Sequence, residues 1–251
     1  MSSTTEFFKN FEFVQYSFGN REDPVLFNNL TQYVDIIDKI KQEVSFLNRY
    51  TIVGGDRPDS LSQKLYGTTD HYWTFYLMND DLRYSGWPVD TSSLLDVAKS
   101  KYPNRTLTID TEFIGALFPV GQEIQGDGSG TVGTIVKRRL DFGQLIVKTT
   151  NDSKFNQGET IRYTETDGTI RTLLTTKEED QYNSVHHFEN TSGEEVDIFD
   201  TNGLPNQTSG LIPITFRDRM EAKNDSLKQI IVIRPDKIDT IVSEFNRTLK
   251  Q

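Results

Sequence analysis

The hydrophobic pattern near the N-terminus predicts one strand followed by one helix. Aromatic and β-branched residues dominate both alternating faces of Phe11–Phe18, and Gly19-Asn20 ends the run, which is typical of a strand. Apolar residues then recur at intervals of three and four, which predicts an amphipathic helix over about Phe27–Glu43. The residues in this apolar stripe are Leu30, Val34, Ile37, Ile40 and Val44.

The stretch Tyr50–Trp87 predicts a short strand followed by two short helices. The strand stops at a Gly-Gly pair, and Pro58 then suits a first helical turn, where its missing N–H costs nothing. Gly67 suits the left-handed position that ends this helix. The second helix, His71–Leu77, ends before the polar run Asn79–Asp81. We therefore expect a compact strand, helix, turn and helix.

From Leu107 onward the helical periodicity is lost, and short β-rich runs alternate with Gly, Asp and Asn. A weak internal repeat relates Phe118–Ile124 to Phe155–Ile161, and each copy is followed by a glycine-bearing turn and another strand. Two similar hairpins that close on each other predict a small barrel or sandwich. The β-rich runs are Gly130–Lys137, Leu145–Thr150, Glu159–Thr164 and Gly168–Thr175.

The C-terminal part predicts an extended loop, a strand and a helix. Asn190–Ser209 is polar and rich in turn-forming residues, so we expect a loop there. Gln229–Ile233 predicts a strand, and Pro235 opens a helix with a clear apolar stripe. That stripe packs either on its own domain or on a neighbouring chain. It consists of Ile238, Ile241, Val242, Phe245 and Leu249.

The composition restricts the classes of partner. The 251 residues are 35% hydrophobic and carry a net charge of −10, with a mean hydropathy of −0.55. This acidity argues against general binding of nucleic acid or of anionic membranes, because both depend on Lys and Arg. The chain has no cysteine. We see neither a signal peptide nor a membrane span, and we expect a soluble protein that is intracellular when made.

A glycine motif and a histidine pair are the main candidates for chemistry. Gly128–Gly133 matches the dinucleotide pattern G-x-G-x-x-G, but β-branched Thr134–Val136 follows where a helix is required, so a hairpin turn is favoured. His186 and His187 are adjacent, and neighbours on a strand point to opposite faces. A zinc site there would need carboxylate ligands, and we favour packing or hydrogen bonding instead.

The acidic motifs do not form a recognisable catalytic or calcium site. Asp200–Gly203 resembles part of a calcium loop, but the first position of the pattern falls on Ile198 and its glutamate position on Ser209. Asp80 and Asp81 are better explained as a solvated helix end than as a catalytic pair. We therefore expect no catalytic, cofactor-binding or metal-binding residues, and no enzyme activity.

Two resemblances emerge from the middle of the chain. Tyr50–Gly67 resembles a LysM module, with a Tyr-Thr-Val-like strand, Gly-Asp, a helix and Tyr-Gly. That resemblance alone implies binding of N-acetylglucosamine polymers. The surrounding residues instead resemble the baseplate wedge proteins of T4-like bacteriophages. The matching segments are Phe8–Phe11, Tyr16–Gly19, Arg57–Asp59, Tyr66-Gly67, Tyr72-Trp73, Met78–Asp80, Tyr84–Pro88, His186–Asn190 and Lys228–Ile233 with the helix after it.

The wedge resemblance implies an architectural role in the baseplate of a contractile tail. It implies contacts with other wedge subunits and with tail hub or sheath-initiating proteins, and location in the virion. It does not cover the β-rich insert closely. Aromatic Tyr84 and Trp87 could anchor a partner, with core packing as the competing interpretation. The other candidate interface residues are those of the C-terminal stripe: Ile238, Ile241 and Phe245.

We therefore expect an α+β protein with a LysM-like strand-helix-helix module, an N-terminal strand and helix, an inserted small all-β module and a C-terminal strand and helix. The expected parts are 1–49, an N-terminal strand and helix; 50–113, the LysM-like module and the segment that follows it; 114–182, the inserted β module; and 183–251, an extended loop with the C-terminal strand and helix. The rival function is that of a LysM-type peptidoglycan-binding module on a cell-wall-active phage protein. Binding of chitooligosaccharides would distinguish the two.

Overall fold

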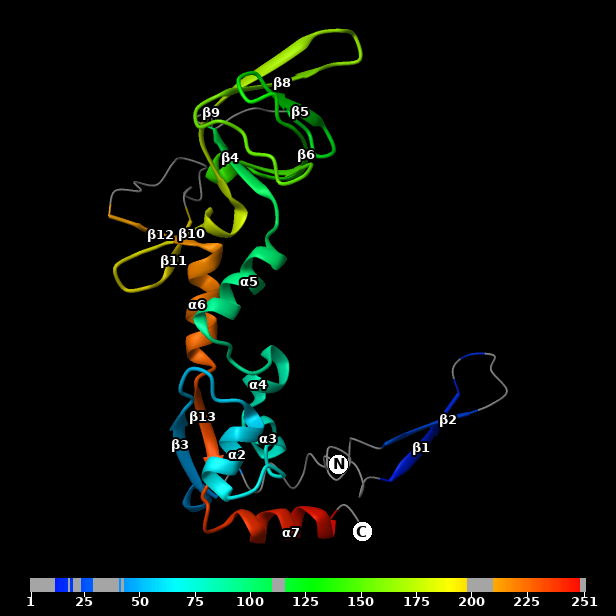
Figure 1. The fold of residues 1–251 in the computed structure, drawn as a ribbon, viewed down its shortest axis with the longest axis vertical. Helices are drawn as coiled ribbons and strands as arrows, with labels where there is room; N and C mark the ends of the chain where they lie inside the picture. The colour runs from blue at the N-terminus through cyan, green and yellow to red at the C-terminus, as the bar shows by residue number, and fades with distance from the viewer. Residues whose placement is uncertain are drawn as a thin grey trace. The chain divides into compact units, whose positions relative to one another are not determined.

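The computed structural model of the protein describes residues 12–17, 19, 24–28, 41, 43–109, 116–197 and 210–248. These residues contain both helices and strands, so the expected α+β class is confirmed. The chain forms two compact units, whose elements are labelled in Figure 1. Unit 1 combines Met1–Asp90 with Asn224–Gln251, and unit 2 consists of Thr91–Lys223.

The N-terminal hairpin consists of β1 (Phe13–Tyr16) and the antiparallel strand β2 (Val25–Asn28). The first strand was expected. The helix predicted from Phe27 is wrong at its start, because Phe27 lies in β2 opposite Val14. At the other end, Val44 begins the short 3-10 helix η3 (Val44–Phe46). The rest of that predicted stripe, Leu30, Val34, Ile37 and Ile40, lies outside the described residues.

The sheet of unit 1 joins two segments from opposite ends of the chain. Strand β3 (Leu47–Thr51) pairs antiparallel with β13 (Gln229–Ile233). The pairing places Arg49 opposite Ile231. Both strands were expected from their β-branched and aromatic residues. Their pairing with each other was not expected.

Two short helices follow β3, as the sequence predicts, and a third succeeds them. Pro58 begins α2 (Pro58–Tyr66), and Gly67 ends it with φ at 75°, where its N–H donates to the Gln63 carbonyl over 3.0 Å. A glycine avoids the steric cost of that left-handed conformation. Helices α3 (Trp73–Met78) and α4 (Asp80–Ser85) are separated by Asn79, which is extended with ψ at 101°.

The core of unit 1 forms where the β3–β13 sheet packs on α2 and α3. The larger apolar cluster of buried residues contains Ile52, Leu61, Phe75, Leu82, Leu227, Ile230 and Val232. A second cluster attaches helix α7 (Ile238–Thr248) to the same unit, and its buried members are Met78, Ile233, Ile238 and Ile241. Ile238, Ile241 and Val242 of the predicted stripe therefore pack on unit 1, while Leu249 lies outside the described residues.

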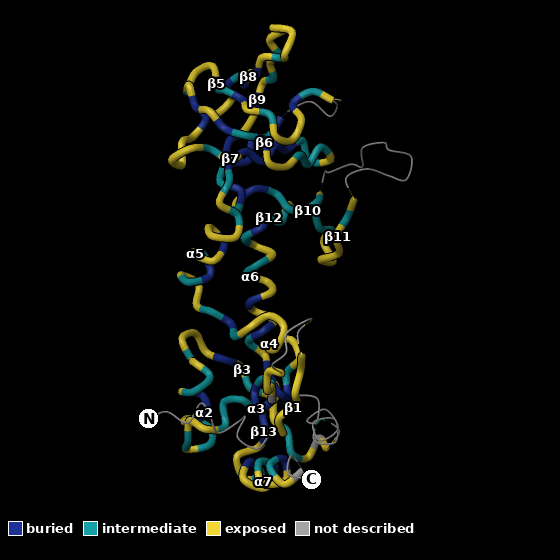
Figure 2. Tube along the Cα trace, turned by 90° about the vertical axis from the view of Figure 1, so that its right-hand side faces the viewer, coloured by how far each residue is buried: buried dark blue, intermediate teal, exposed yellow. Residues whose placement is uncertain are grey.

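Unit 2 is built around a closed antiparallel barrel with strand order β4-β7-β6-β5-β8-β9. The sequence allowed a barrel or a sandwich, and the structure has the barrel. Strand β7 contributes four consecutive buried residues, which appear dark blue in Figure 2. The strands are β4 (Arg105–Ile109), β5 (Glu123–Gly126), β6 (Val132–Arg139), β7 (Gln144–Thr149), β8 (Thr160–Thr164) and β9 (Ile170–Asp180).

Strand β4 closes the barrel by pairing with both β7 and β9. It therefore belongs with the β module, although the sequence-based boundary at residue 114 excludes it. The boundary missed it because residues 110–115 separate β4 from the β-rich runs, so that β4 reads as the end of the preceding region. Its side chains fill the barrel core together with buried residues of β5, β6, β7 and β8, and Leu173 of β9 packs against them partly buried. The buried cluster is Leu107, Ile109, Phe118, Ile124, Ile135, Leu145, Val147, Phe155, Ile161 and Tyr163.

Unit 2 also contains two helices that the sequence analysis did not predict. Helix α5 (Thr91–Lys101) buries only Leu94 and Ala98. Helix α6 (Phe216–Ser226) is polar, with Phe216 and Asn224 as its buried residues. So few apolar positions do not produce a visible helical period. Two further 3-10 turns, η4 (Leu140–Phe142) and η5 (Gln181–Asn183), connect strands.

A small sheet of order β11-β10-β12 completes unit 2. Strand β10 (Val185–Glu189) lies between β11 (Glu195–Val196) and β12 (Ile212–Thr215). The loop expected over Asn190–Ser209 is thus interrupted by β11, and 198–209 lies outside the described residues. The sequence missed β11 because two paired residues are too few to show alternation.

The chain leaves unit 1 and returns to it at neighbouring positions. The Asn224 side chain accepts a hydrogen bond from the Val89 N–H over 2.9 Å and donates one to the Val89 carbonyl over 3.0 Å. The side-chain amide thus pairs with the backbone of Val89 as a second peptide group would. Unit 2 is therefore an insertion whose two points of attachment to unit 1 are held together.

Candidate protein interface

The N-terminal hairpin exposes large apolar side chains. Their exposed fractions range from 39% for Val25 to 70% for Phe13. Soluble proteins seldom expose such groups together unless the surface is used for binding. The exposed apolar residues are Phe13, Val14, Tyr16, Val25, Leu26 and Phe27.

Both faces of the hairpin carry apolar side chains. Alternate residues of a strand share one face, and the register places Val14 opposite Phe27 and Tyr16 opposite Val25 on the first face. The second face carries the apolar residues Phe13 and Leu26 beside Gln15 and Asn28. A two-stranded hairpin is marginally stable alone in water. Contact with a partner would stabilise it, so the hairpin is our first candidate interface.

The outer edge of β13 is covered by side chains of unit 1. The Asn79 side chain accepts a hydrogen bond from the Ile231 N–H and donates one to the Ile231 carbonyl, both at 2.8 Å. The Tyr66 hydroxyl donates to the Ile233 carbonyl over 3.0 Å, and burial raises the pKa of Tyr66 to about 12, so this donor keeps its proton. The break between α3 and α4 thus replaces a neighbouring strand.

Within the described residues, the outer edge of β3 pairs with no strand. Ile52 donates to the Lys228 carbonyl over 2.8 Å, and Arg234 donates to the Phe46 carbonyl over 2.8 Å. Inward-bonded and outward-pointing residues alternate in an antiparallel pair, so the backbone N–H and C=O of Arg49 point away from β13. Arg49 is exposed, and in the described part of the chain β3 pairs with β13 alone. This edge is our second candidate interface.

Tyr84 and Trp87, the two aromatic candidates, occupy different environments. Tyr84 on α4 is 86% exposed. Trp87 is half-buried, packs its ring 5.9 Å from that of Phe75, and donates from its indole N–H to the Asp56 carbonyl over 2.7 Å. Trp87 therefore anchors the segment after α4 to the core, whereas Tyr84 is available to a partner.

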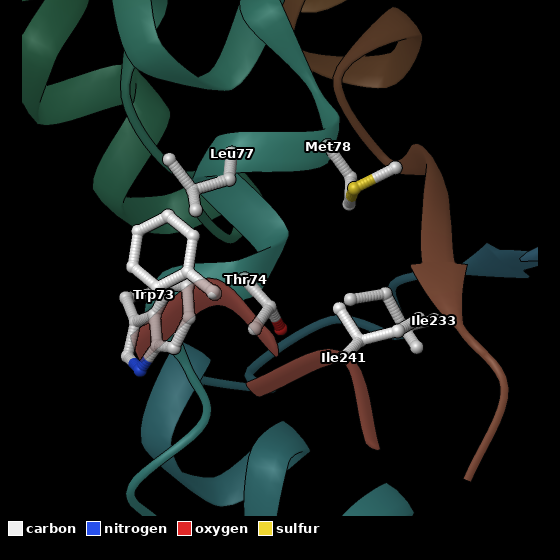
Figure 3. A pocket seen from close by; sticks show the side chains of 7 residues that line it. Trp73, Thr74, Leu77, Met78, Ile233 and Ile241 are labelled. Atoms are coloured by element: carbon white, nitrogen blue, oxygen red, sulfur yellow. The ribbon is translucent and has the colours of Figure 1, made fainter. Parts of the chain in front are cut away.

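The candidate residues on α7 are buried within unit 1. Ile238, Ile241 and Phe245 are exposed by 3%, 7% and 2%. Phe245 packs its ring 5.0 Å from that of Trp73 on α3. Figure 3 shows the small apolar pocket that remains between α3, β13 and α7. These three side chains belong to the core of a single chain, which is the alternative that the sequence left open for them.

The glycine motif forms a hairpin turn between β5 and β6, as expected. The turn wraps around the carboxylate of Glu159, which accepts hydrogen bonds from the Gly128, Ser129 and Asn156 N–H groups at 2.7–2.8 Å and from the Ser129 hydroxyl. Burial alone would raise the pKa of Glu159, but these hydrogen bonds outweigh it and hold the pKa below its usual range. The amides thus hold the chain's own carboxylate.

His186 and His187 contact each other, contrary to the expectation of opposite faces. A β-bulge between Val185 and His187 shifts the register against β12. As a result the two Nδ1 atoms lie 2.9 Å apart, and His187 Nε2 lies 3.0 Å from Glu189 Oε1.

His186 is neutral at ordinary pH. Its burial, together with the nearby Arg219 and Arg139, lowers its pKa to about 4. Its Nε2 lies 3.0 Å from an Arg219 guanidinium nitrogen, which donates to it. Across the described residues, no group of three or more His, Asp or Glu side chains is arranged to hold a metal ion. We interpret this pair as part of the packing around β10.

The acidic pair Asp80 and Asp81 begins α4. Asp80 forms an ion pair with Lys41 over 2.8 Å and another with Arg83. The hydrogen bond from Lys41 is the main reason that the pKa of Asp80 is lowered. Carboxylates also interact favourably with the positive end of a helix. The pair fits the helix-end interpretation, while Asp200–Gly203 lies outside the described residues.

Comparison with known families assigns part of the chain. Residues 5–107 match the family model described as base plate wedge protein 53. This segment contains the hairpin, β3 and helices α2 to α5, and it ends within β4. A comparison with curated proteins gives no match. None of the helices in the described ranges is long and apolar enough to cross a membrane. The resemblance to phage baseplate wedge proteins is thus confirmed over residues 5–107, the part of the chain that matches that family.

Proposed function

We propose that the chain is an architectural subunit of the baseplate of a contractile phage tail, where it binds its neighbours without catalysing a reaction. The carrying observation is that the segment matched to the wedge family also contains the exposed apolar hairpin. Subunits of an assembly must hide apolar surface on one another, and the hairpin provides such a surface. Its partners in this proposal are other wedge subunits and tail hub or sheath-initiating proteins.

We also propose that unit 1 is LysM-like in its arrangement and that it serves protein contact. The order strand β3, helix α2, helix α3 and strand β13 supports this reading, with β13 supplied after the insertion. Net charge supports protein contact over glycan contact, because a chain at −10 has no attraction to an anionic cell wall.

Fractionation of purified virions tests the proposal most directly. We expect the chain, made in the host cytoplasm, to be recovered with the tail baseplate. Co-expression with the other wedge subunits should give a stable complex. Recovery of the chain outside the virion, with no complex on co-expression, would contradict the proposal.

Tyr84 provides the residue-level test. Tyr84→Ala should weaken incorporation into the complex by about 2 kcal/mol or more if this exposed tyrosine is an interface anchor. Val120→Ala is a matched control, because Val120 is 60% exposed but lies in unit 2. Equal incorporation of both variants would remove Tyr84 from the interface.

The rival function is binding of peptidoglycan through the LysM-like module. Calorimetric titration with chitooligosaccharides separates the two functions. We expect no heat of binding, since a single module gains nothing from repetition within the chain. Saturable binding, together with indifference to wedge subunits, would favour the rival.

A further inference from the structure

We infer that a histidine network in unit 2 is an acid-sensitive contact, which opens by taking up a proton at His186 and so releases the start of α6 from β10. The network consists of Arg219 on α6 and of His186, His187 and Glu189 on β10. This device is independent of the baseplate role, because it lies within one unit of one chain.

Three contacts join the network end to end. His186 Nε2 lies 3.0 Å from an Arg219 guanidinium nitrogen. The Nδ1 atom of His186 lies 2.9 Å from His187 Nδ1, and His187 Nε2 lies 3.0 Å from Glu189 Oε1. The edge of the His186 ring also packs against Phe216 at the start of α6, with ring centroids 4.9 Å apart. The imidazole of His186 is therefore the group through which the network holds α6 to β10.

The positions of the protons follow from the direction of these contacts. A guanidinium only donates hydrogen bonds, so His186 accepts at Nε2 and carries its proton on Nδ1. His187 then accepts at Nδ1 and donates from Nε2 to Glu189. Both rings are neutral in this arrangement. A further proton on His186 must bind at Nε2, so it displaces the Arg219 guanidinium.

The surroundings of His186 also oppose a positive charge. Arg219 faces this ring from α6, Arg139 faces it from β6, and His187 lies beside it on β10. Glu195 of β11 favours the charge, but its effect is smaller. Burial, followed by the two arginines, lowers the pKa of His186 from 6.5 to about 4.

The direction of the pH effect follows from this lowered pKa. The opened or unfolded chain binds a proton at His186 near pH 6.5, whereas the closed network does so only near pH 4. The stabilisation by the network is therefore complete above pH 6.5 and is lost as the pH falls toward 4.

The start of α6 is the part of unit 2 that this loss releases. Phe216 packs on the rings of His186 and Tyr102, and the Arg139 guanidinium lies 5.1 Å from the centre of its ring. A proton on His186 adds a positive charge beside Arg139 and Arg219, so the contacts that hold Phe216 and Arg219 in place weaken together. The barrel keeps its structure, because its buried cluster is hydrophobic.

Hydrogen exchange of the purified chain at pH 7 and pH 5 tests the opening. After correction for the pH dependence of exchange in unstructured peptides, amides at the start of α6 should exchange about tenfold faster at pH 5. His186→Gln should remove this difference, because its amide oxygen still accepts from Arg219 but takes up no proton. His71→Gln, a matched control in unit 1, should leave the difference unchanged. Equal exchange at both pH values in the unaltered chain, or a difference that persists in His186→Gln, would overturn the inference.

Nitrogen NMR of the imidazole rings tests the proton positions in the unaltered chain. At pH 7 the proton of His186 should lie on Nδ1 and that of His187 on Nε2, and His186 should titrate near pH 4. Arg219→Gln changes an exposed residue and removes the facing charge, so the titration midpoint of His186 should rise toward its ordinary value. A neutral His186 with its proton on Nε2, or a midpoint that Arg219→Gln leaves unchanged, would refute the network as an acid-sensitive contact.

Discussion

The barrel of unit 2 and the β3–β13 sheet of unit 1 deal with the edges of a β-sheet in opposite ways. In the barrel, β4 pairs with strands on both sides and the sheet closes, so it has no edge. In the β3–β13 sheet, one edge is covered by Asn79 and Tyr66, and within the described residues the other edge pairs with no strand. The binding capacity of a sheet thus depends on a few side chains beside it. The barrel can offer partners only side chains, whereas the β3–β13 sheet also offers backbone.

The first prediction tests whether the cores of units 1 and 2 are independent of each other. Phe75 is fully buried in unit 1 and packs on Tyr66 and Trp87. Phe75→Ala should lower the stability of unit 1 by about 3–5 kcal/mol. Calorimetry should show its transition shifted while that of the barrel stays in place, because distant sites act additively. As the reciprocal control, Leu107→Ala should shift only the barrel. A joint shift in either variant would mean that the units share a core.

The second prediction concerns Glu159, whose carboxylate holds the turn between β5 and β6 of the barrel. Glu159→Gln should cost about 1.5–3 kcal/mol, the typical value of hydrogen bonds to a charged group. The folded pKa of Glu159 is lowered, so its contribution is full above the unfolded pKa, near 4.3, and is lost as the pH falls through the folded pKa. Acid titration of the barrel's melting temperature should show this loss, and Glu159→Gln should weaken it. Glu123→Gln, at an exposed position of β5, should leave the profile unchanged.

The third prediction concerns the side chains of Asn79 and Tyr66, which cover the outer edge of β13. Asn79→Ala should destabilise unit 1 by about 1–3 kcal/mol, because it leaves backbone groups of Ile231 without their partner. It also opens a second edge, so aggregation measured by light scattering should increase. The milder Tyr66→Phe should cost about 0.5–1.5 kcal/mol. Unchanged aggregation in Asn79→Ala would show that this edge needs no cover.

The smallest effect is expected from removing unit 2 entirely. Asp90 can be joined to Asn224 by a short Gly/Ser bridge, because Asn224 already holds Val89. Closing so short a loop costs little entropy. The shortened chain should keep the unit 1 melting transition within about 0.5 kcal/mol. Loss of that transition would mean that unit 1 depends on unit 2.

The sequence predicted elements well where local chemistry determines them. Pro58 and Gly67 mark the two ends of α2, and a run of consecutive β-branched residues marks β13. Helix α6 escaped prediction because its sequence is polar and few of its side chains are buried. Strand β4 was assigned to the wrong side of a boundary, since closure of a barrel depends on partners far away in the sequence.

The candidate interface was harder to foresee than the elements. The alternation in Phe11–Phe18 predicted a strand but not that Phe13, Val14 and Tyr16 are exposed, because exposure depends on what else covers them. The stripe of α7 was ambiguous in the sequence, because apolar residues such as Ile238 and Phe245 suit either an interface or a core. In the structure both are buried. Asn79 read as a helix break, and only the fold reveals that it covers a sheet edge.

The pairing of β3 with β13 has a consequence for synthesis on the ribosome. Residues 47–51 emerge long before residues 229–233, and all of unit 2 is made in between. The barrel can close during translation, but the core of unit 1 waits for Ile230 and Val232. A chain that stops before residue 229 therefore carries a finished barrel on an unfinished unit 1. Such a chain lacks the β3–β13 sheet and the core that packs on it, so premature termination should leave unit 1 unfolded beside an intact barrel.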